Sequence, residues 1–151
     1  MIDTSENASS KVSCGRVVRK IALNLCKSHW LPSCMRCRLA HLGGVNIDRS
    51  CFLGESVLFD TIRPELITIG KGCTITARCC FLSHFRKGST YYYGDVKIGN
   101  RVFIGTGTVI ANSVTVGDDA IIGAGSIVTK DIPAGEIWAG NPAKFIKMRT
   151  D

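Results

Sequence analysis

The sequence of 151 residues lacks the segments that carry a protein into or across a membrane. No stretch approaches the eighteen or so apolar residues that a transmembrane helix needs. The first ten residues, MIDTSENASS, lack the positive start and apolar run of a signal peptide, and their polar composition predicts disorder. We therefore expect a cytoplasmic protein in which thiols stay reduced.

Acidic residues are missing between Glu6 and Asp48, whereas basic residues are frequent there. Apolar residues between Arg16 and Lys27 recur with helical spacing, which predicts a short amphipathic helix, and a second short helical segment is expected near Cys34 to His41. Three interpretations of this basic segment remain open: a solvated helix face, contact with an anionic membrane or polymer, or a partner site. We expect no nucleic-acid partner.

Residues that bind metals are also sparse. The chain has three histidines, at 29, 41 and 84, and Cys34 and Cys37 have the spacing of half a zinc site. No second pair follows at ligand spacing, so we expect no metal site.

A six-residue repeat runs through the second half of the chain, from Ile98 to Pro133. An aliphatic residue opens each unit: Ile98, Ile104, Ile110, Val116, Ile122 and Val128. A small or apolar residue follows four places later: Val102, Thr108, Val114, Ala120, Ser126 and Ile132. An even spacing keeps strand side chains on one face, whereas a helix of period six would drift around its axis. The repeat therefore predicts a solenoid of short strands with three strands in each coil.

The same register explains cysteines that would otherwise resemble a disulfide framework. Cys51, Cys73 and Cys79 each follow an aliphatic residue by four places, in the small inward slot of the repeat. We interpret them as compact core residues.

Two interruptions break the repeat. Four residues are inserted around Arg63 to Leu66, directly after Asp60, which occupies a slot where glycine is usual and is a candidate substrate contact. A longer loop at about 83–96 separates Phe81 from Ile98, with His84 at its entrance. A loop of this length inside a regular solenoid usually serves binding, so we expect one site to contain the loop and His84.

Outward positions of the repeat carry apolar side chains on two of the three faces. At eighteen residues per coil, Phe103 should stack beside Ile121, and Val109 beside Ile127. A monomer would expose these patches, so we expect a neighbouring subunit to cover one face and the N-terminal helix to cover the other.

The repeat, together with the tail TKDIPAGEIWAGNPAKFI, resembles the hexapeptide-repeat acyltransferases, closest to the maltose and galactoside O-acetyltransferase branch. The resemblance implies an all-β solenoid, a left-handed parallel β-helix, built as homotrimers with active sites between subunits. We divide the chain into an N-terminal tail and helical segment at 1–44 and a β-helix domain at 45–151, with its closing segment at 134–151.

In this family, a histidine at the position of His84 is the catalytic base for transfer from acetyl-CoA. A neutral imidazole can take the proton of an acceptor hydroxyl in the transition state. The nearby Cys79 and Cys80 would allow an acyl-cysteine route, but Cys79 should face inward and Cys80 has no visible activating partner except His84. Direct transfer is therefore favoured.

The resemblance also implies binding residues. Those matching the acetyl-CoA groove and its phosphates are Thr106, Ala124, Thr129, Lys130, Lys144 and Lys147. Asp60 matches a polar acceptor-binding position that is asparagine in the galactoside-type enzymes. Phe103 borders the acceptor region or forms an interface, and Tyr91 and Tyr92 stack on a sugar or close a subunit contact.

The leading hypothesis is an acetyl-CoA-dependent O-acetyltransferase acting on a saccharide hydroxyl, in surface polysaccharide assembly. The alternatives are N-acetylation of an amino sugar or nucleotide sugar, and a noncatalytic β-helix scaffold. A carbonic anhydrase of this fold would need several histidines on adjacent coils, and the coils offer only His84.

Overall fold

The computed structural model describes residues 14–150, so the disorder expected for residues 1–10 lies outside the described residues. Two helices come first, α1 (Cys14–Leu25) and α2 (Ser33–Leu42), within two residues of the predicted segments. No helix in this described part is both long and apolar enough to cross a membrane.

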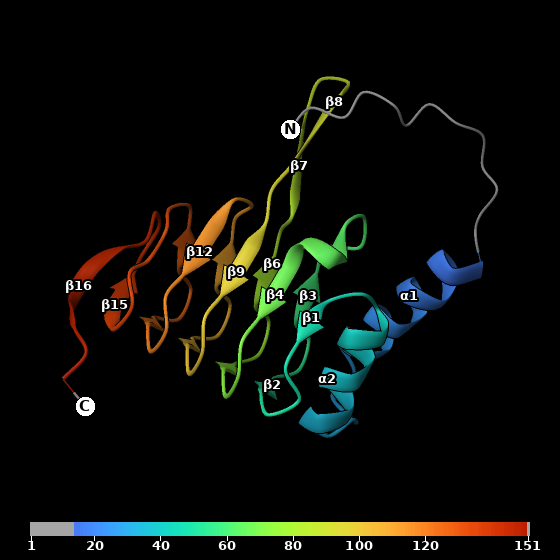
Figure 1. The fold of residues 1–151 in the computed structure, drawn as a ribbon, viewed down its shortest axis with the longest axis horizontal. Coiled ribbons are helices and arrows are strands. Elements are labelled where there is room, and N and C mark those ends of the chain that lie inside the picture. Colours follow the sequence, from blue (N-terminus) through green and yellow to red (C-terminus); the bar gives the residue numbers. More distant parts are fainter. Residues whose placement is uncertain (1–13, 151) are drawn as a thin grey trace.

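Three parallel sheets form the walls of a prism (Figure 1). Sheet A consists of β1 (Asn46–Ile47), β4 (Ile67–Ile69), β9 (Val96–Ile98) and β12 (Val114–Val116). Sheet B consists of β2 (Phe52–Leu53), β5 (Thr74–Ile75), β10 (Phe103–Ile104), β13 (Ile121–Ile122), β15 (Glu136–Ala139) and the antiparallel β16 (Lys144–Met148). Sheet C consists of β3 (Leu58–Phe59), β6 (Cys80–Phe81), β11 (Val109–Ile110) and β14 (Ile127–Val128). The chain visits the sheets in the order A, B, C, and this confirms three strands per coil.

The shaft of the prism is filled by the positions that the repeat predicts. All six opening aliphatic residues and all six residues four places later are buried. Cys51, Cys73 and Cys79 are buried too, and each thiol donates a hydrogen bond to a backbone carbonyl of the next coil. They are compact core residues, as predicted.

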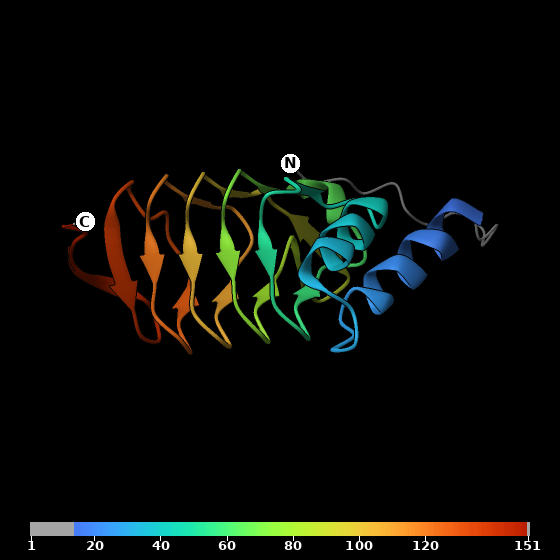
Figure 2. The same cartoon turned by 90° about the horizontal axis from the view of Figure 1, so that it is seen from below.

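The two helices close the first end of the prism (Figure 2). Leu23, Cys26, Cys37 and Ala40 join the same hydrophobic core as the shaft residues, so the core is continuous from α1 into the coils. The expectation that the N-terminal helix covers an apolar outer face is wrong, because burying these four residues places the helices against the first coil instead.

Both apolar outer faces therefore remain uncovered in the single chain. Phe103 pairs with Ile121 on sheet B and Val109 with Ile127 on sheet C, as the eighteen-residue count predicts. Phe52 and Phe103 on sheet B and Leu58 on sheet C are exposed. Sheet A has polar outward residues instead: Asn46, Thr68, Lys97 and Thr115.

The two interruptions lie at the corner where the chain passes from sheet C to sheet A. The first contains a short 3-10 helix, η1 (Pro64–Leu66). The second is not an irregular loop but an antiparallel hairpin of β7 (His84–Lys87) and β8 (Thr90–Tyr93), which projects from the prism (Figure 1). Gly88 adopts φ +61° in the turn, a conformation that glycine adopts without steric cost, and the tyrosine run favours a strand.

Phe81 provides a test of how much the packing of the shaft contributes to stability. Its ring is fully buried and stacks on Phe59 at 5.3 Å between centroids, one coil away and directly before Asp60. Replacing Phe81 with alanine should lower the free energy of unfolding by about 3–5 kcal/mol, because a large cavity forms where the coil cannot collapse. Denaturant unfolding at fixed protein concentration measures the change. Phe85→Ala on the exposed hairpin is the control and should cost much less; equal losses would contradict this account of the core.

Candidate active site

His84 and Asp60 form a hydrogen-bonded pair at the corner between sheets C and A. Asp60 directly follows β3, and His84 begins β7 after the next coil. The pairing of Phe59 with Phe81 places Asp60 level with Leu82, two residues before His84, so both side chains lie at the same corner. The imidazole Nδ1 then meets Oδ2 of Asp60 at hydrogen-bond distance. The His84 side chain is 24% exposed and that of Asp60 only 1%, so the histidine faces solvent and its hydrogen-bond partner is buried.

The Asp60 carboxylate is held by two further donors. The backbone N–H of Ile62 donates to Oδ1 at 2.9 Å, and that of Ser83 donates to Oδ2 at 3.0 Å. Burial alone would raise the pKa of Asp60, but the hydrogen bonds from Ile62, His84 and Ser83 outweigh it and hold the pKa below its usual value. The group beside His84 is therefore a carboxylate at neutral pH.

This arrangement fixes the tautomer of the histidine. A carboxylate accepts hydrogen bonds and cannot donate them, so Nδ1 must be the donor. A neutral imidazole therefore carries its proton on Nδ1 and keeps a lone pair on Nε2. A base with a free lone pair, oriented by a buried carboxylate, is suited to remove a proton from a hydroxyl. Sequence reasoning assigned Asp60 to substrate contact; its carboxylate is instead occupied by these three donors.

Aromatic and cationic side chains surround the imidazole on the hairpin. The His84 ring lies 6.0 Å from that of Tyr91 and 6.3 Å from that of Tyr93. The guanidinium of Arg86 lies over Tyr91 and that of Arg63 over Tyr93. The predicted Tyr92 points to the other face of the hairpin, where it stacks on Phe85.

Residues matching the acetyl-CoA groove divide between two corners of the prism. Thr106 and Ala124 follow β10 and β13, at the corner between sheets B and C. Thr129 and Lys130 follow β14, at the corner that also holds His84, and two coils further along. At about 4.8 Å per coil, this is about 10 Å along the prism. All four side chains are exposed, but one chain does not bring them into a single groove.

Phe103 and the two tail lysines are also separated from His84. Phe103 points outward from sheet B, the wall opposite the corner of His84. Lys144 and Lys147 are exposed on β16, at the far end of sheet B. If these residues share a site with His84, the site needs a second copy of the chain.

The two cysteines before the hairpin have the properties of thiols and not of thiolates. Burial raises the pKa of Cys79, which lies in the shaft. Burial, with the charge of Asp60, also raises the pKa of Cys80. Neither environment activates a nucleophile.

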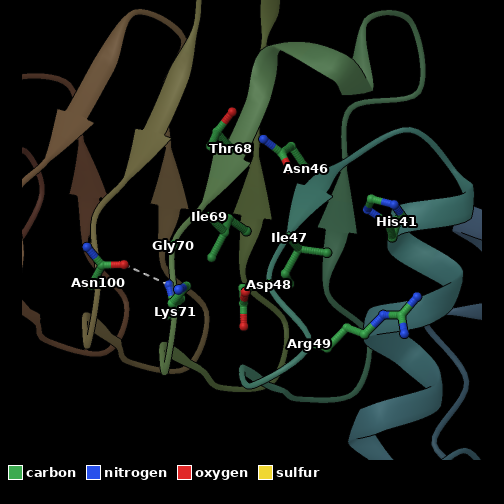
Figure 3. A pocket seen from close by; sticks show the side chains of 10 residues that line it. All are labelled: His41, Asn46, Ile47, Asp48, Arg49, Thr68, Ile69, Gly70, Lys71 and Asn100. Carbon is green, nitrogen blue, oxygen red and sulfur yellow. Dashed lines mark hydrogen bonds between the residues drawn. The ribbon is translucent and has the colours of Figure 1, made fainter.

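A separate hollow of about 540 Å³ lies on sheet A beside α2 (Figure 3). It is lined by His41, Asn46, Ile47, Asp48, Arg49, Thr68, Ile69, Gly70, Lys71 and Asn100. Asp48, Gly70 and Asn100 belong to the corner between sheets A and B, at the other edge of sheet A from His84. None of the predicted catalytic or binding residues lines this hollow.

Sequence reasoning missed the partner of His84 and the two arginines. Counting coils would have placed Asp60 at the same corner as His84, because Phe59 and Phe81 occupy the same place in successive coils, but level with Leu82 and not with His84. Arg86 could have been found from the hairpin signal Gly88-Ser89, since alternation then places residues 84 and 86 on one face. Arg63 gives no such signal, because it lies in an irregular insertion.

Comparisons with known proteins agree with this fold. Residues 95–130 match the family model described as bacterial transferase hexapeptide (six repeats). Protein CapG of Staphylococcus aureus is 45% identical over 111 residues, which is 68% of this chain and 60% of CapG. This chain spans between 34% and 60% of the length of three curated relatives.

Two solved structures extend the comparison. A galactoside acetyltransferase in complex with coenzyme A is 25% identical, with a TM-score of 0.67 over 94% of this chain and 86% of its own. The polySia specific acetyltransferase NeuO is 33% identical, with a TM-score of 0.59 over 71% of this chain and 55% of its own. The fold is thus the left-handed parallel β-helix of hexapeptide repeats. The chain belongs to the hexapeptide-repeat acyltransferase family, as the repeat and tail predicted.

Proposed function

We propose that this chain is an acetyl-CoA-dependent O-acetyltransferase that acts on a saccharide hydroxyl, with His84 as general base. The observation that carries the proposal is the hydrogen bond between His84 Nδ1 and the buried carboxylate of Asp60, which leaves Nε2 to accept a proton. Asp60 acts as a positioning residue: it fixes the tautomer and stabilises the imidazolium that forms.

The chemistry follows from this arrangement. The acceptor hydroxyl gives its proton to Nε2 as its oxygen attacks the thioester carbonyl carbon of acetyl-CoA. The tetrahedral oxyanion collapses, the carbon–sulfur bond breaks, and the imidazolium returns the proton to the leaving thiolate. The raised pKa values of Cys79 and Cys80 support direct transfer over an acyl-cysteine route.

The coenzyme and part of the acceptor site would lie between two copies of the chain. Thr106 and Ala124 from one subunit would face Thr129 and Lys130 from the next, with Lys144 and Lys147 close to the coenzyme phosphates. Phe103 of one subunit would border the acceptor bound at the His84 of its neighbour. The exposed apolar faces of sheets B and C support the homotrimer that the resemblance implies.

A saccharide acceptor is supported by the acetyltransferases for galactosides and polySia that this chain resembles. A role in surface polysaccharide assembly and a cytoplasmic location belong to the same proposal.

Acetyl-CoA should stabilise the protein and should be cleaved when a suitable sugar is present. A ligand at a hundred times its dissociation constant adds about 2.7 kcal/mol to the free energy of unfolding, which raises the melting temperature. Thermal melts with and without acetyl-CoA measure the first effect. Release of the coenzyme thiol across neutral sugars, acidic sugars and amino sugars measures the second.

The same panel separates the alternatives. Acetylation of amino sugars alone would replace O-transfer with N-transfer. If acetyl-CoA neither stabilises the protein nor is cleaved by it, the protein would be a noncatalytic scaffold.

A further inference from the structure

The hairpin β7–β8 has two faces with different chemistry. Its register pairs His84 with Tyr93 and Arg86 with Tyr91, and these four side chains share one face. On the other face, the rings of Phe85 and Tyr92 stack at 4.8 Å and nearly parallel. The two rings of the second face pack on each other, whereas the polar groups beside His84 lie on the first face.

On the first face, the side chains form a stacked row. The rings of Tyr91 and Tyr93 are stacked 6.2 Å apart. Arg86 lies 5.6 Å from the centroid of Tyr91, and Arg63 lies 5.3 Å from that of Tyr93. A guanidinium held over an aromatic ring keeps its planar edge of N–H donors free to approach a carboxylate or phosphate.

Among the charged groups at this corner, Arg86 differs in having no ion pair with an acidic side chain of the described residues. Arg63 is paired with Glu65 at 2.6 Å, and Lys97 with Asp95 at 3.2 Å. Asp60 is buried against His84. Arg86 is exposed, its Nε donates to the carbonyl of Gly88, and no acidic side chain within residues 14–150 forms an ion pair with it. Lys87, the remaining cation, lies on the opposite face of the hairpin.

The spacing between base and cation suits one sugar unit. Residues two apart on a strand lie about 7 Å from each other on the same face, so Arg86 is displaced from His84 by about that distance. We propose that the acceptor is an anionic saccharide, whose carboxylate or phosphate binds Arg86 while a hydroxyl on the same or the adjacent sugar unit lies at His84. This inference rests on the proposed O-acetyltransferase function and names the class of its acceptor.

The test compares two probes that differ in charge, methyl galactoside and methyl galacturonoside. Thiol release with the wild-type protein should give a kcat/KM about tenfold higher for the galacturonoside, the size of effect expected for one exposed charge-assisted contact. Arg86→Gln should remove that preference, so that the ratio of kcat/KM for the two glycosides falls from about ten to about one. Glucose 1-phosphate, compared with glucose, tests the phosphate form of the same chemistry.

Lys87→Gln is the matched control, because it removes the neighbouring cation from the other face. It should leave the preference for the galacturonoside unchanged. Equal losses in the Lys87 and Arg86 variants would mean that general charge attracts the acceptor, and this would overturn the assignment of Arg86. Ligand-observed NMR binding of both glycosides adds a readout that does not need turnover, and Arg86→Gln should weaken binding of the acid alone.

The outcomes also separate this inference from the proposed function. If the wild-type protein turns over the acidic and neutral members of both pairs equally, that result would support the O-acetyltransferase function and would overturn the proposal that the acceptor is anionic. Failure to acetylate any sugar hydroxyl would overturn both.

Discussion

Replacing His84 with alanine is expected to lower kcat for acetyl transfer by about a hundredfold to ten-thousandfold, the range that a positioned general base contributes. The acceptor hydroxyl would lose the only imidazole at this corner, and Cys80, whose pKa is raised by burial, cannot replace it. Thiol release from acetyl-CoA with an active acceptor measures the loss.

Binding of acetyl-CoA should survive the His84 substitution, because the residues that match the coenzyme groove lie on other coils and on β16. Thermal stabilisation by acetyl-CoA in the variant checks this. Addition of free imidazole should restore part of the rate if the missing function is proton transfer. A variant with unchanged kcat would remove His84 from the mechanism.

His41→Ala is the matched control for the loss of an imidazole. His41 is exposed on α2 and lines the hollow on sheet A, at the other edge of that sheet from His84. It should keep its activity within about twofold, as is usual for surface substitutions away from a site. If His41→Ala were inactive and His84→Ala active, the catalytic centre would lie in the hollow.

The coils could be predicted from the sequence because their information is local. The same inward positions recur every six residues, so the burial of Ile104 and Ile122 can be predicted from their place in the repeat without knowledge of distant contacts. Phe103 and Ile121 were placed side by side by counting alone, and the structure confirms this. Regular repeats contact only their neighbours, which makes such counting reliable.

Other parts of the site depend on departures from the repeat. The partner of His84 is 24 residues away, because the four-residue insertion lengthens that coil from eighteen to twenty-two residues and His84 lies two places further beyond its strand than Asp60 does. The hairpin was predicted as a loop because its side chains are polar and aromatic and have no buried face. Its strands are held by each other and by the tyrosine stack, and neither follows from the period of six.

Changing Asp60 to asparagine is expected to lower kcat by about a hundredfold or more, because the substitution favours the wrong tautomer of His84. Asparagine has one carbonyl oxygen, whereas the carboxylate accepts from Ile62 at one oxygen and from Ser83 and His84 at the other. With its oxygen facing Ile62, the amide NH₂ would face Nδ1 and donate to it. The proton of a neutral imidazole would then lie on Nε2, which could no longer act as a base. The ratio of kcat values for the two proteins at equal acetyl-CoA saturation measures this effect, and Asp95→Asn, an exposed carboxylate paired with Lys97, should leave kcat unchanged.

The same substitution should change how stability depends on pH. The pKa of Asp60 is lower in the folded protein than its ordinary value of 3.8, so between these values the unfolded chain binds more protons. The carboxylate therefore stabilises the fold above the ordinary pKa, and this stabilisation is lost as the pH falls through the folded value. At pH 7, Asp60→Asn should cost about 1–3 kcal/mol, the penalty for a buried N–H or imidazole left without its acceptor. The difference in free energy of unfolding between wild type and variant should shrink below about pH 4. A difference that stays constant from pH 7 to pH 3 would show that the Asp60 carboxylate is not held by these hydrogen bonds.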